Sequence, residues 1–134
     1  MDFAYMEYRE ILRNYPESKF SEPSLFAVGE YFFINSNFKE SAPVFVSFVQ
    51  RFPDAKGKLF ALAYLLKMAQ ARSDTDGEKD LTNQIVTFKQ LGLVFKDSKE
   101  VKYASPLYRK LRAVFYIDKI EFYTQGELLL SIAY

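Results

Sequence analysis

Residues 22–53 read EPSLFAVGEYFFINSNFKESAPVFVSFVQRFP, and this stretch contains the pattern on which the fold depends. Glu22-Pro23 is typical of a helix start, because proline is favoured at the first helical position. Apolar residues then recur at helical spacing, at Leu25, Val28 and Phe32. The polar run Asn35-Ser36-Asn37 interrupts this pattern. A second helical stretch ends before Pro53, which cannot continue it. The stretch therefore predicts a helix, a tight turn and a second helix.

The same plan recurs on both sides of this stretch. Aligning Pro16 with Pro53 pairs upstream residues of similar size on one helix face, namely Ala4 with Ser41, Tyr8 with Phe45, Ile11 with Phe48, Leu12 with Val49 and Tyr15 with Phe52. Downstream, residues 57–95 predict an apolar helix (Leu59, Leu62, Leu65, Leu66, Ala69), a polar loop at Ser73-Asp74-Thr75-Asp76-Gly77 and a partner helix (Leu81, Ile85, Phe88, Leu91). Such self-similarity is typical of helical repeats.

Two features depart from a regular repeat. Pro43 lies within the second helix of the best repeat and removes a backbone donor, so we expect that helix to kink or to start late. Met1 falls where the second helix of the first unit should begin. This suggests either a fragment of a longer chain or a protein whose own first helix is a cap.

The stretch from Leu25 to Pro53 resembles a tetratricopeptide (TPR) repeat. Leu25, Val28-Gly29, Phe32, Phe38, Ser41, Phe45 and Pro53 fall at the family's aromatic, Leu-Gly, Tyr, Tyr, small, aromatic and Pro positions. The segments YREILRNYPESKF (8–20) and FVSFVQRFPDAKG (45–57) are most similar to BamD-like outer-membrane assembly lipoproteins and related bacterial envelope TPR proteins. The resemblance covers residues 1–93. It implies a short α-solenoid of antiparallel helix pairs over residues 1–95 and a periplasmic or outer-membrane-associated location.

The resemblance also implies a binding site for a protein partner. The first helix of each TPR repeat lines a concave groove that holds an extended or helical peptide. The groove positions carried over from the family are Phe26, Glu30, Phe33, Ile34, Phe60, Ala63, Lys67 and Gln70. The alternative is that these aromatic residues pack on the adjacent repeat.

Residues 96–134 are not explained by the repeat and are expected to form an appendage packed on it as one domain. Ser105-Pro106 is a plausible start for a short helix through Leu107, Leu111 and Val114. A loop at Thr124-Gln125-Gly126 would then pair Phe122 with Leu128 and Ile120 with Leu130 in a β-hairpin. The alternative is a helix that ends at Gly126, followed by ELLLSIAY as the first helix of another repeat. The expected fold class is mostly α.

The charge of the chain is unevenly distributed. The formal net charge is +1, with acidic residues in excess over residues 1–52 and basic residues in excess from Lys96 to Lys119. Such a small basic excess argues against nucleic-acid binding. A basic, aromatic cluster, Tyr103, Tyr108, Arg109, Lys110 and Arg112, is suited to an acidic partner or anionic headgroups, and the alternative is a solvated helix face.

Composition narrows the possible chemistry. The absence of Cys and His excludes thiol nucleophiles, Cys/His zinc sites and imidazole acid–base catalysis. Asp118 and Glu121 form a carboxylate pair of the kind glycosidases use, but this spacing is common on helix surfaces. We therefore expect a non-catalytic interaction module or scaffold with no cofactor or metal. No apolar run is long enough to span a membrane.

Two alternative functions remain open at this point. The first is a regulatory or substrate-recognition domain of a larger envelope enzyme, for example one that acts on peptidoglycan. The second is a structural subunit in which the edge of the hairpin pairs between copies of the chain.

Overall fold

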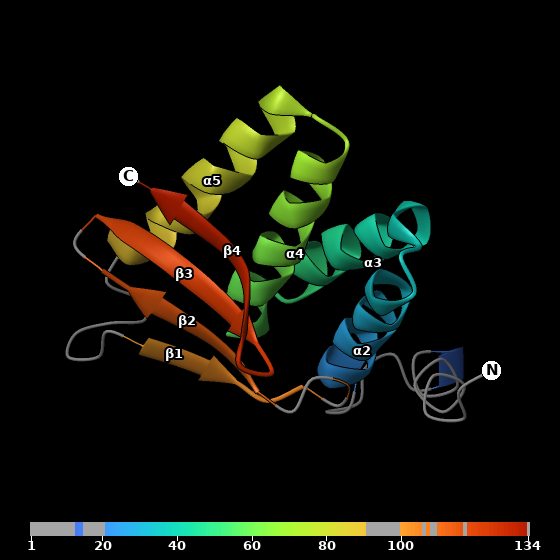
Figure 1. Cartoon of the computed structure of the whole chain (residues 1–134). Helices are drawn as coiled ribbons and strands as arrows, with labels where there is room; N and C mark the ends of the chain where they lie inside the picture. Colours follow the sequence, from blue (N-terminus) through green and yellow to red (C-terminus); the bar gives the residue numbers. More distant parts are fainter. Residues whose placement is uncertain are drawn as a thin grey trace.

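A helical part is followed along the chain by a β-sheet (Figure 1). The computed structural model describes residues 13–14, 21–90, 100–105, 107, 110–116 and 118–133, with side chains at all of these except 88–90. The helices within these ranges are α2 (Ser21–Ile34), α3 (Phe38–Arg51), α4 (Gly57–Ala71) and α5 (Thr75–Gln90). The strands are β1 (Glu100–Tyr103), β2 (Leu111–Phe115), β3 (Lys119–Thr124) and β4 (Glu127–Ala133). The fold is thus mixed, with more residues in helices than in strands.

The helices form two hairpins, α2 with α3 and α4 with α5, and α3 packs on α4. The predicted break between the first two is confirmed, because Ser36 has a φ of 58° and the Asn37 side chain accepts a hydrogen bond from the backbone N–H of Glu40. An N-cap of this kind satisfies a helix donor that otherwise has no partner. The predicted end before Pro53 is also confirmed, since α3 ends at Arg51. The proposed repeat upstream of Pro16 lies outside the described residues, apart from Arg13 and Asn14.

One alternative of the helical prediction is excluded and one detail is wrong. α3 begins at Phe38, which excludes a late start as the effect of Pro43, whereas the other expected effect, a kink, stays a prediction. The polar loop between α4 and α5 is shorter than expected, because Thr75, Asp76 and Gly77 belong to the first turn of α5. Asp74 makes this early start possible, since its Oδ1 accepts a hydrogen bond from the backbone N–H of Gly77 at 3.1 Å.

The α2–α3 contact is unusually close at Gly29. A Cβ atom at this position would lie 2.8 Å from Cζ of Phe45, so only glycine fits without moving the ring. The hydroxyl of Ser41 donates to the carbonyl oxygen of Gly29 at 2.8 Å beside this contact. Gly29, Ser41 and Phe45, three of the positions that carry the TPR resemblance, thus meet in one helix–helix contact.

The four strands form an antiparallel sheet in the order β1-β2-β3-β4. The expected short helix through Leu111 and Val114 is wrong, because Leu111–Phe115 is a strand in which Leu111, Ala113 and Phe115 are buried. Alternation of buried and exposed side chains is the period of a strand with one face on the core. Val101, Phe122 and Leu130 share that face with Ala113 through the register of the sheet.

The predicted hairpin between β3 and β4 is present, which excludes the alternative of a helix ending at Gly126. Its turn has two residues, Gln125 (φ 51°) and Gly126 (φ 84°), both in the left-handed region that matches the twist of a tight hairpin. The predicted register is wrong. The turn has two residues where three were predicted, and a bulge between Phe122 and Tyr123 shifts the register once more. As a result Phe122 lies opposite Leu130, Tyr123 opposite Leu128 and Ile120 opposite Ile132.

One hydrophobic core joins the helices to the sheet. It contains side chains from α2 to α5 and from all four strands. Phe60 of α4 packs on Phe122 and Tyr103, with ring centroids 6.1 and 5.8 Å apart. Phe26 of α2 packs on Tyr103 at 5.1 Å. The sheet therefore has an inner face on the helices and an outer face that carries Lys102, Arg112 and Tyr123 in one row.

Candidate functional site

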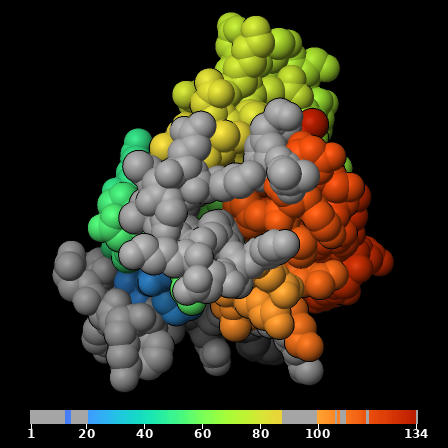
Figure 2. Space-filling view, turned by 90° about the vertical axis from the view of Figure 1, so that its left-hand side faces the viewer, coloured from blue at the N-terminus to red at the C-terminus, as the bar shows by residue number. Residues whose placement is uncertain are grey.

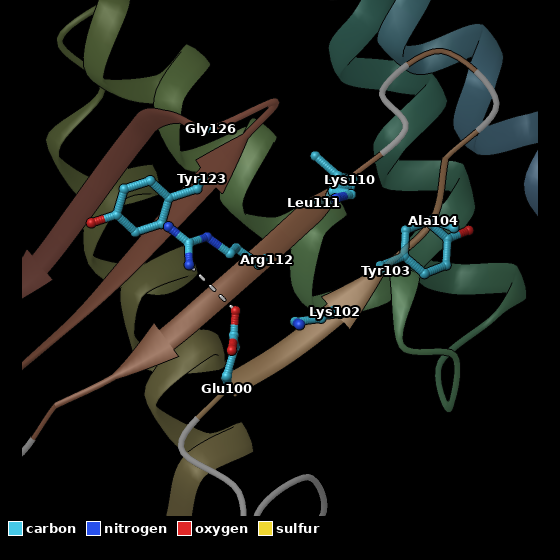
Figure 3. Close-up of a pocket in the computed structure, with 9 residues that line it drawn as sticks. All are labelled: Glu100, Lys102, Tyr103, Ala104, Lys110, Leu111, Arg112, Tyr123 and Gly126. Atoms are coloured by element: carbon cyan, nitrogen blue, oxygen red, sulfur yellow. Dashed lines mark ion pairs between the residues drawn. The ribbon is translucent and has the colours of Figure 1, made fainter.

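A pocket lies at the end of the sheet where β1 ends and β2 begins (Figure 3). Its volume of about 470 Å³ falls within the range of small-ligand and side-chain sites. Three basic residues and one acidic residue line it, together with two tyrosines. The lining residues are Glu100, Lys102, Tyr103, Ala104, Lys110, Leu111, Arg112, Tyr123 and Gly126. We call this the β1–β2 pocket.

Arg112 of β2 is the best-positioned cation of the pocket. Its Nη1 atom lies 3.5 Å from Oε1 of Glu100, and its guanidinium carbon lies 4.5 Å from the centre of the Tyr123 ring. Figure 3 shows the guanidinium between these two groups. An exposed ion pair of this kind adds little stability, but two partners restrict the orientation of the side chain. Arg112 therefore presents its charge on the outer face in a defined direction.

Lys102 and Lys110 add positive charge beside Arg112. Both side chains are exposed and line the pocket, Lys102 from β1 and Lys110 from the residue before β2. Lys102 lies directly opposite Arg112 in the register. Because Glu100 is the only acidic residue among the described lining residues, this part of the pocket has an excess of positive charge that favours an anionic ligand.

The phenol of Tyr123 is hydrogen-bonded to Glu121, which lies two residues earlier in the same strand, β3. The Tyr123 hydroxyl donates to Oε1 of Glu121 at 3.0 Å, and this bond to a carboxylate raises the pKa of Tyr123. Lys119 lies 3.7 Å from the other oxygen of Glu121 and 5.1 Å from the centre of the Tyr116 ring. Glu121, which the sequence offered as half of a carboxylate pair with Asp118, is thus engaged with Tyr123 and Lys119.

A buried carboxyl group holds the segment that forms one wall of the pocket. Glu30 of α2 is fully buried and accepts a hydrogen bond from the Tyr64 hydroxyl of α4 at 3.0 Å. Its other oxygen is hydrogen-bonded to the hydroxyl of Ser105, which directly follows the pocket residues Tyr103 and Ala104. Burial raises the pKa of Glu30 well above its ordinary value, and the bond from Tyr64 opposes this only in part.

Tyr103 connects the pocket to the same interior. Its ring packs on Phe26 and Phe60, although it also lines the pocket. Burial raises the pKa of Tyr103, and the nearby carboxyl groups of Glu22 and Glu30 raise it further. Tyr103 therefore belongs both to the wall of the pocket and to the hydrophobic core.

The structure does not leave the predicted TPR groove open. Four of its eight residues, Phe26, Glu30, Phe60 and Ala63, are buried. Phe33 is partly buried against Phe38 and Tyr64, with ring centroids 5.1 and 4.8 Å away. The other three, Ile34, Lys67 and Gln70, are exposed.

The physical reason is that side chains of the sheet and of the segment after β1 contact α2 and α4 at positions that a partner was expected to fill. Phe26 and Phe60 contact Tyr103, and Glu30 bonds to Ser105. The four residues Phe26, Glu30, Phe60 and Ala63 are therefore not exposed to a partner in this structure. The alternative, in which the aromatic residues pack on the adjacent repeat, describes Phe26 and Phe60 in part, because both also contact Tyr103 of the sheet.

The basic cluster predicted from the sequence is partly brought together. Lys110 and Arg112 line the pocket, whereas Tyr108 and Arg109 lie outside the described residues. Lys102, Glu100 and Tyr123 were not identified as site residues. The strand alternation in LRAVF (111–115) was the available signal, because it places Arg112 on the face opposite the core.

Metal sites and membrane-spanning helices are two other features that bear on function. Within the described ranges, no group of three or more Asp or Glu side chains is arranged to hold a metal ion. Among the helices that the structure describes, none combines the length and apolar character needed to cross a bilayer.

Comparison of the chain with models of known protein families, with curated proteins and with solved structures finds no significant match.

Proposed function

We propose that this protein is a non-catalytic interaction module that binds an acidic segment of a partner protein in the β1–β2 pocket. The observation that carries the proposal is the convergence of Lys102, Lys110 and Arg112 on one pocket. Glu100, the only acidic residue among those described in its lining, is paired with Arg112. Carboxylates and basic side chains at an interface give orientation and a fast on-rate. The two tyrosines supply stiff contact area for the apolar parts of the ligand.

The helices act as a TPR-like scaffold in this proposal. Its support is the sequential packing of two helical hairpins and the Gly29–Phe45 contact at positions that match the TPR pattern. The recognition surface, however, is the outer face of the sheet, since Phe26, Glu30 and Phe60 are buried in contacts with Tyr103 and Ser105. The bacterial envelope is the proposed setting, on the basis of the resemblance of residues 8–20 and 45–57 alone.

The test is binding of a fluorescent peptide with Glu at every fourth position and Thr at the others, measured by anisotropy at about 0.15 M salt. Lys102→Glu and Lys110→Glu, which reverse charges of the pocket, should each weaken binding by about tenfold or more, corresponding to roughly 1.4 kcal/mol. The matched control is Lys79→Glu, an equal charge change at an exposed position of α5. It should have little effect, because exposed charges beyond a Debye length are screened.

Two results would contradict the proposal. One is the absence of measurable binding by the wild-type protein. The other is an equal loss of affinity in the Lys79→Glu control and in the pocket variants, which would show that only net charge matters.

A further inference from the structure

The β1–β2 pocket adjoins an edge of the sheet. β1 is the first strand in the order β1-β2-β3-β4 and pairs with β2 alone among the described strands. It lies at the lower margin of the sheet in Figure 1. Edge strands present backbone donors and acceptors that can pair with another chain. β1 therefore contributes both to the pocket and to this edge of the described sheet. Figure 2 shows atoms of β1, in light orange, at the surface of the molecule.

The pocket takes several of its lining residues from this edge. Glu100, Lys102 and Tyr103 belong to β1, and Ala104 follows it. Figure 3 shows Lys102 on β1, beside Arg112 on β2. Lys102, Arg112 and Tyr123 form one row across three strands, because the register places them directly opposite one another. A strand added beyond β1 would extend this row by one side chain, next to Lys102.

We infer that the acidic segment binds in extended form and pairs with β1 as a fifth strand. This inference rests on the proposed function and adds the conformation of the ligand. Backbone hydrogen bonds to β1 provide affinity, and the side chains that point to the outer face provide specificity. The occupant is identified by charge complementarity with Lys102, Lys110 and Arg112.

Two rows of side chains on the outer face, those of Lys102 and Glu100, also determine which residues are favourable in the bound segment. In the row of Lys102, an acidic side chain directly opposite is favourable. In the next row, Glu100 lies opposite Val114, so an acidic side chain facing Glu100 would be repelled. The segment should therefore have Asp or Glu facing Lys102 and a neutral or basic residue two positions away, facing Glu100.

The features of β1 also limit unwanted pairing. The strand has only four residues and an exposed lysine, and short edges with lysine resist nonspecific strand addition. A basic strand would be repelled at Lys102, whereas an acidic strand is attracted. The short length of β1 and the charge of Lys102 therefore disfavour nonspecific strand addition and favour an acidic strand.

Two peptides with the same side chains test this inference. The first is the Glu–Thr peptide used above, and the second is its fully N-methylated form, which keeps the carboxylates but lacks every backbone donor. The intact protein should bind the N-methylated peptide about tenfold or more weakly than the first. Binding of the first peptide should also slow hydrogen exchange of the backbone amides of β1.

The outcomes separate the two proposals. Weaker binding of the N-methylated peptide together with protected β1 amides supports strand addition. Equal binding of both peptides, lost in Lys102→Glu and without protection of β1, overturns strand addition but leaves acidic capture in place. If neither peptide binds, both the proposed function and the inference are overturned.

Discussion

Glu30→Ala should lower the free energy of unfolding by about 2–4 kcal/mol at neutral pH, because it removes a buried side chain and the hydrogen bonds that two hydroxyl groups make to it. These are the hydroxyls of Tyr64 and Ser105, which bond to the two carboxyl oxygens of Glu30. Glu30→Gln retains the shape and hydrogen-bonding capacity of the side chain and should cost much less. Urea unfolding followed by circular dichroism measures both changes.

The same variants should differ in their dependence on pH. In the unfolded chain Glu30 titrates near its ordinary value of 4.5, whereas burial raises its pKa in the folded protein. Between these two values the folded state holds a proton that the unfolded state has released, so stability falls as pH rises. The contribution of Glu30 is fully present below 4.5 and is lost as pH rises through the raised pKa.

Glu30→Gln removes this contribution because its amide does not titrate. The difference in unfolding free energy between Glu30→Gln and wild type should therefore grow in favour of the variant as pH increases from acidic to neutral. A difference that stays constant over this interval would contradict a raised pKa for Glu30. A change in the opposite direction would indicate that the folded protein stabilises the carboxylate.

Phe26→Ala should lower the free energy of unfolding by about 3–5 kcal/mol, the usual cost of removing a buried aromatic ring. The Phe26 side chain is fully buried. Its ring centroid lies between 5.1 and 6.0 Å from those of four other rings, Phe45, Phe48, Tyr64 and Tyr103. These rings belong to α3, α4 and β1, so the substitution weakens the packing of α2 on both the helices and the sheet.

The matched control is Ile34→Ala, also on α2. Ile34 is 50% exposed, so its truncation should change stability by no more than about 0.5 kcal/mol. Both variants can be compared by thermal and urea unfolding, and Phe26→Leu, which retains part of the volume, provides a milder step if Phe26→Ala does not fold. Equal effects at Phe26 and Ile34 would contradict the described arrangement of α2 against the sheet.

The helices could be predicted from the sequence because their signals are local. Pro23, the run Asn35-Ser36-Asn37 and Pro53 mark the ends of helices by the chemistry of their own backbone and side chains. The contacts that α2 and α4 make with the sheet could not be predicted from these signals. A hint was present in LFALAYLLKMA (59–69), since a helix that is apolar on nearly all sides is buried on nearly all sides.

The sheet was harder to predict because two local signals were in conflict. Ser105-Pro106 resembles a helix start, whereas LRAVF (111–115) alternates as a strand does. The strand prevails because it pairs with β1 and β3, and because Leu111, Ala113 and Phe115 on its inner face are buried in the core shared with the helices. Part of the candidate site, Glu100, Lys102 and Tyr123, was missed for the same reason. Lys102, Arg112 and Tyr123 come together only through strand pairing, which brings distant parts of the sequence side by side.

We propose that recognition takes place on the outer face of the sheet and not in a groove between helices. This can be tested by following backbone-amide NMR signals while the Glu–Thr peptide is titrated into the intact protein. We expect chemical-shift changes at Lys102, Lys110, Arg112 and Tyr123, with the signals of the exposed groove positions Ile34, Lys67 and Gln70 unchanged. Shifts confined to Ile34, Lys67 and Gln70, with the pocket unchanged, would contradict it.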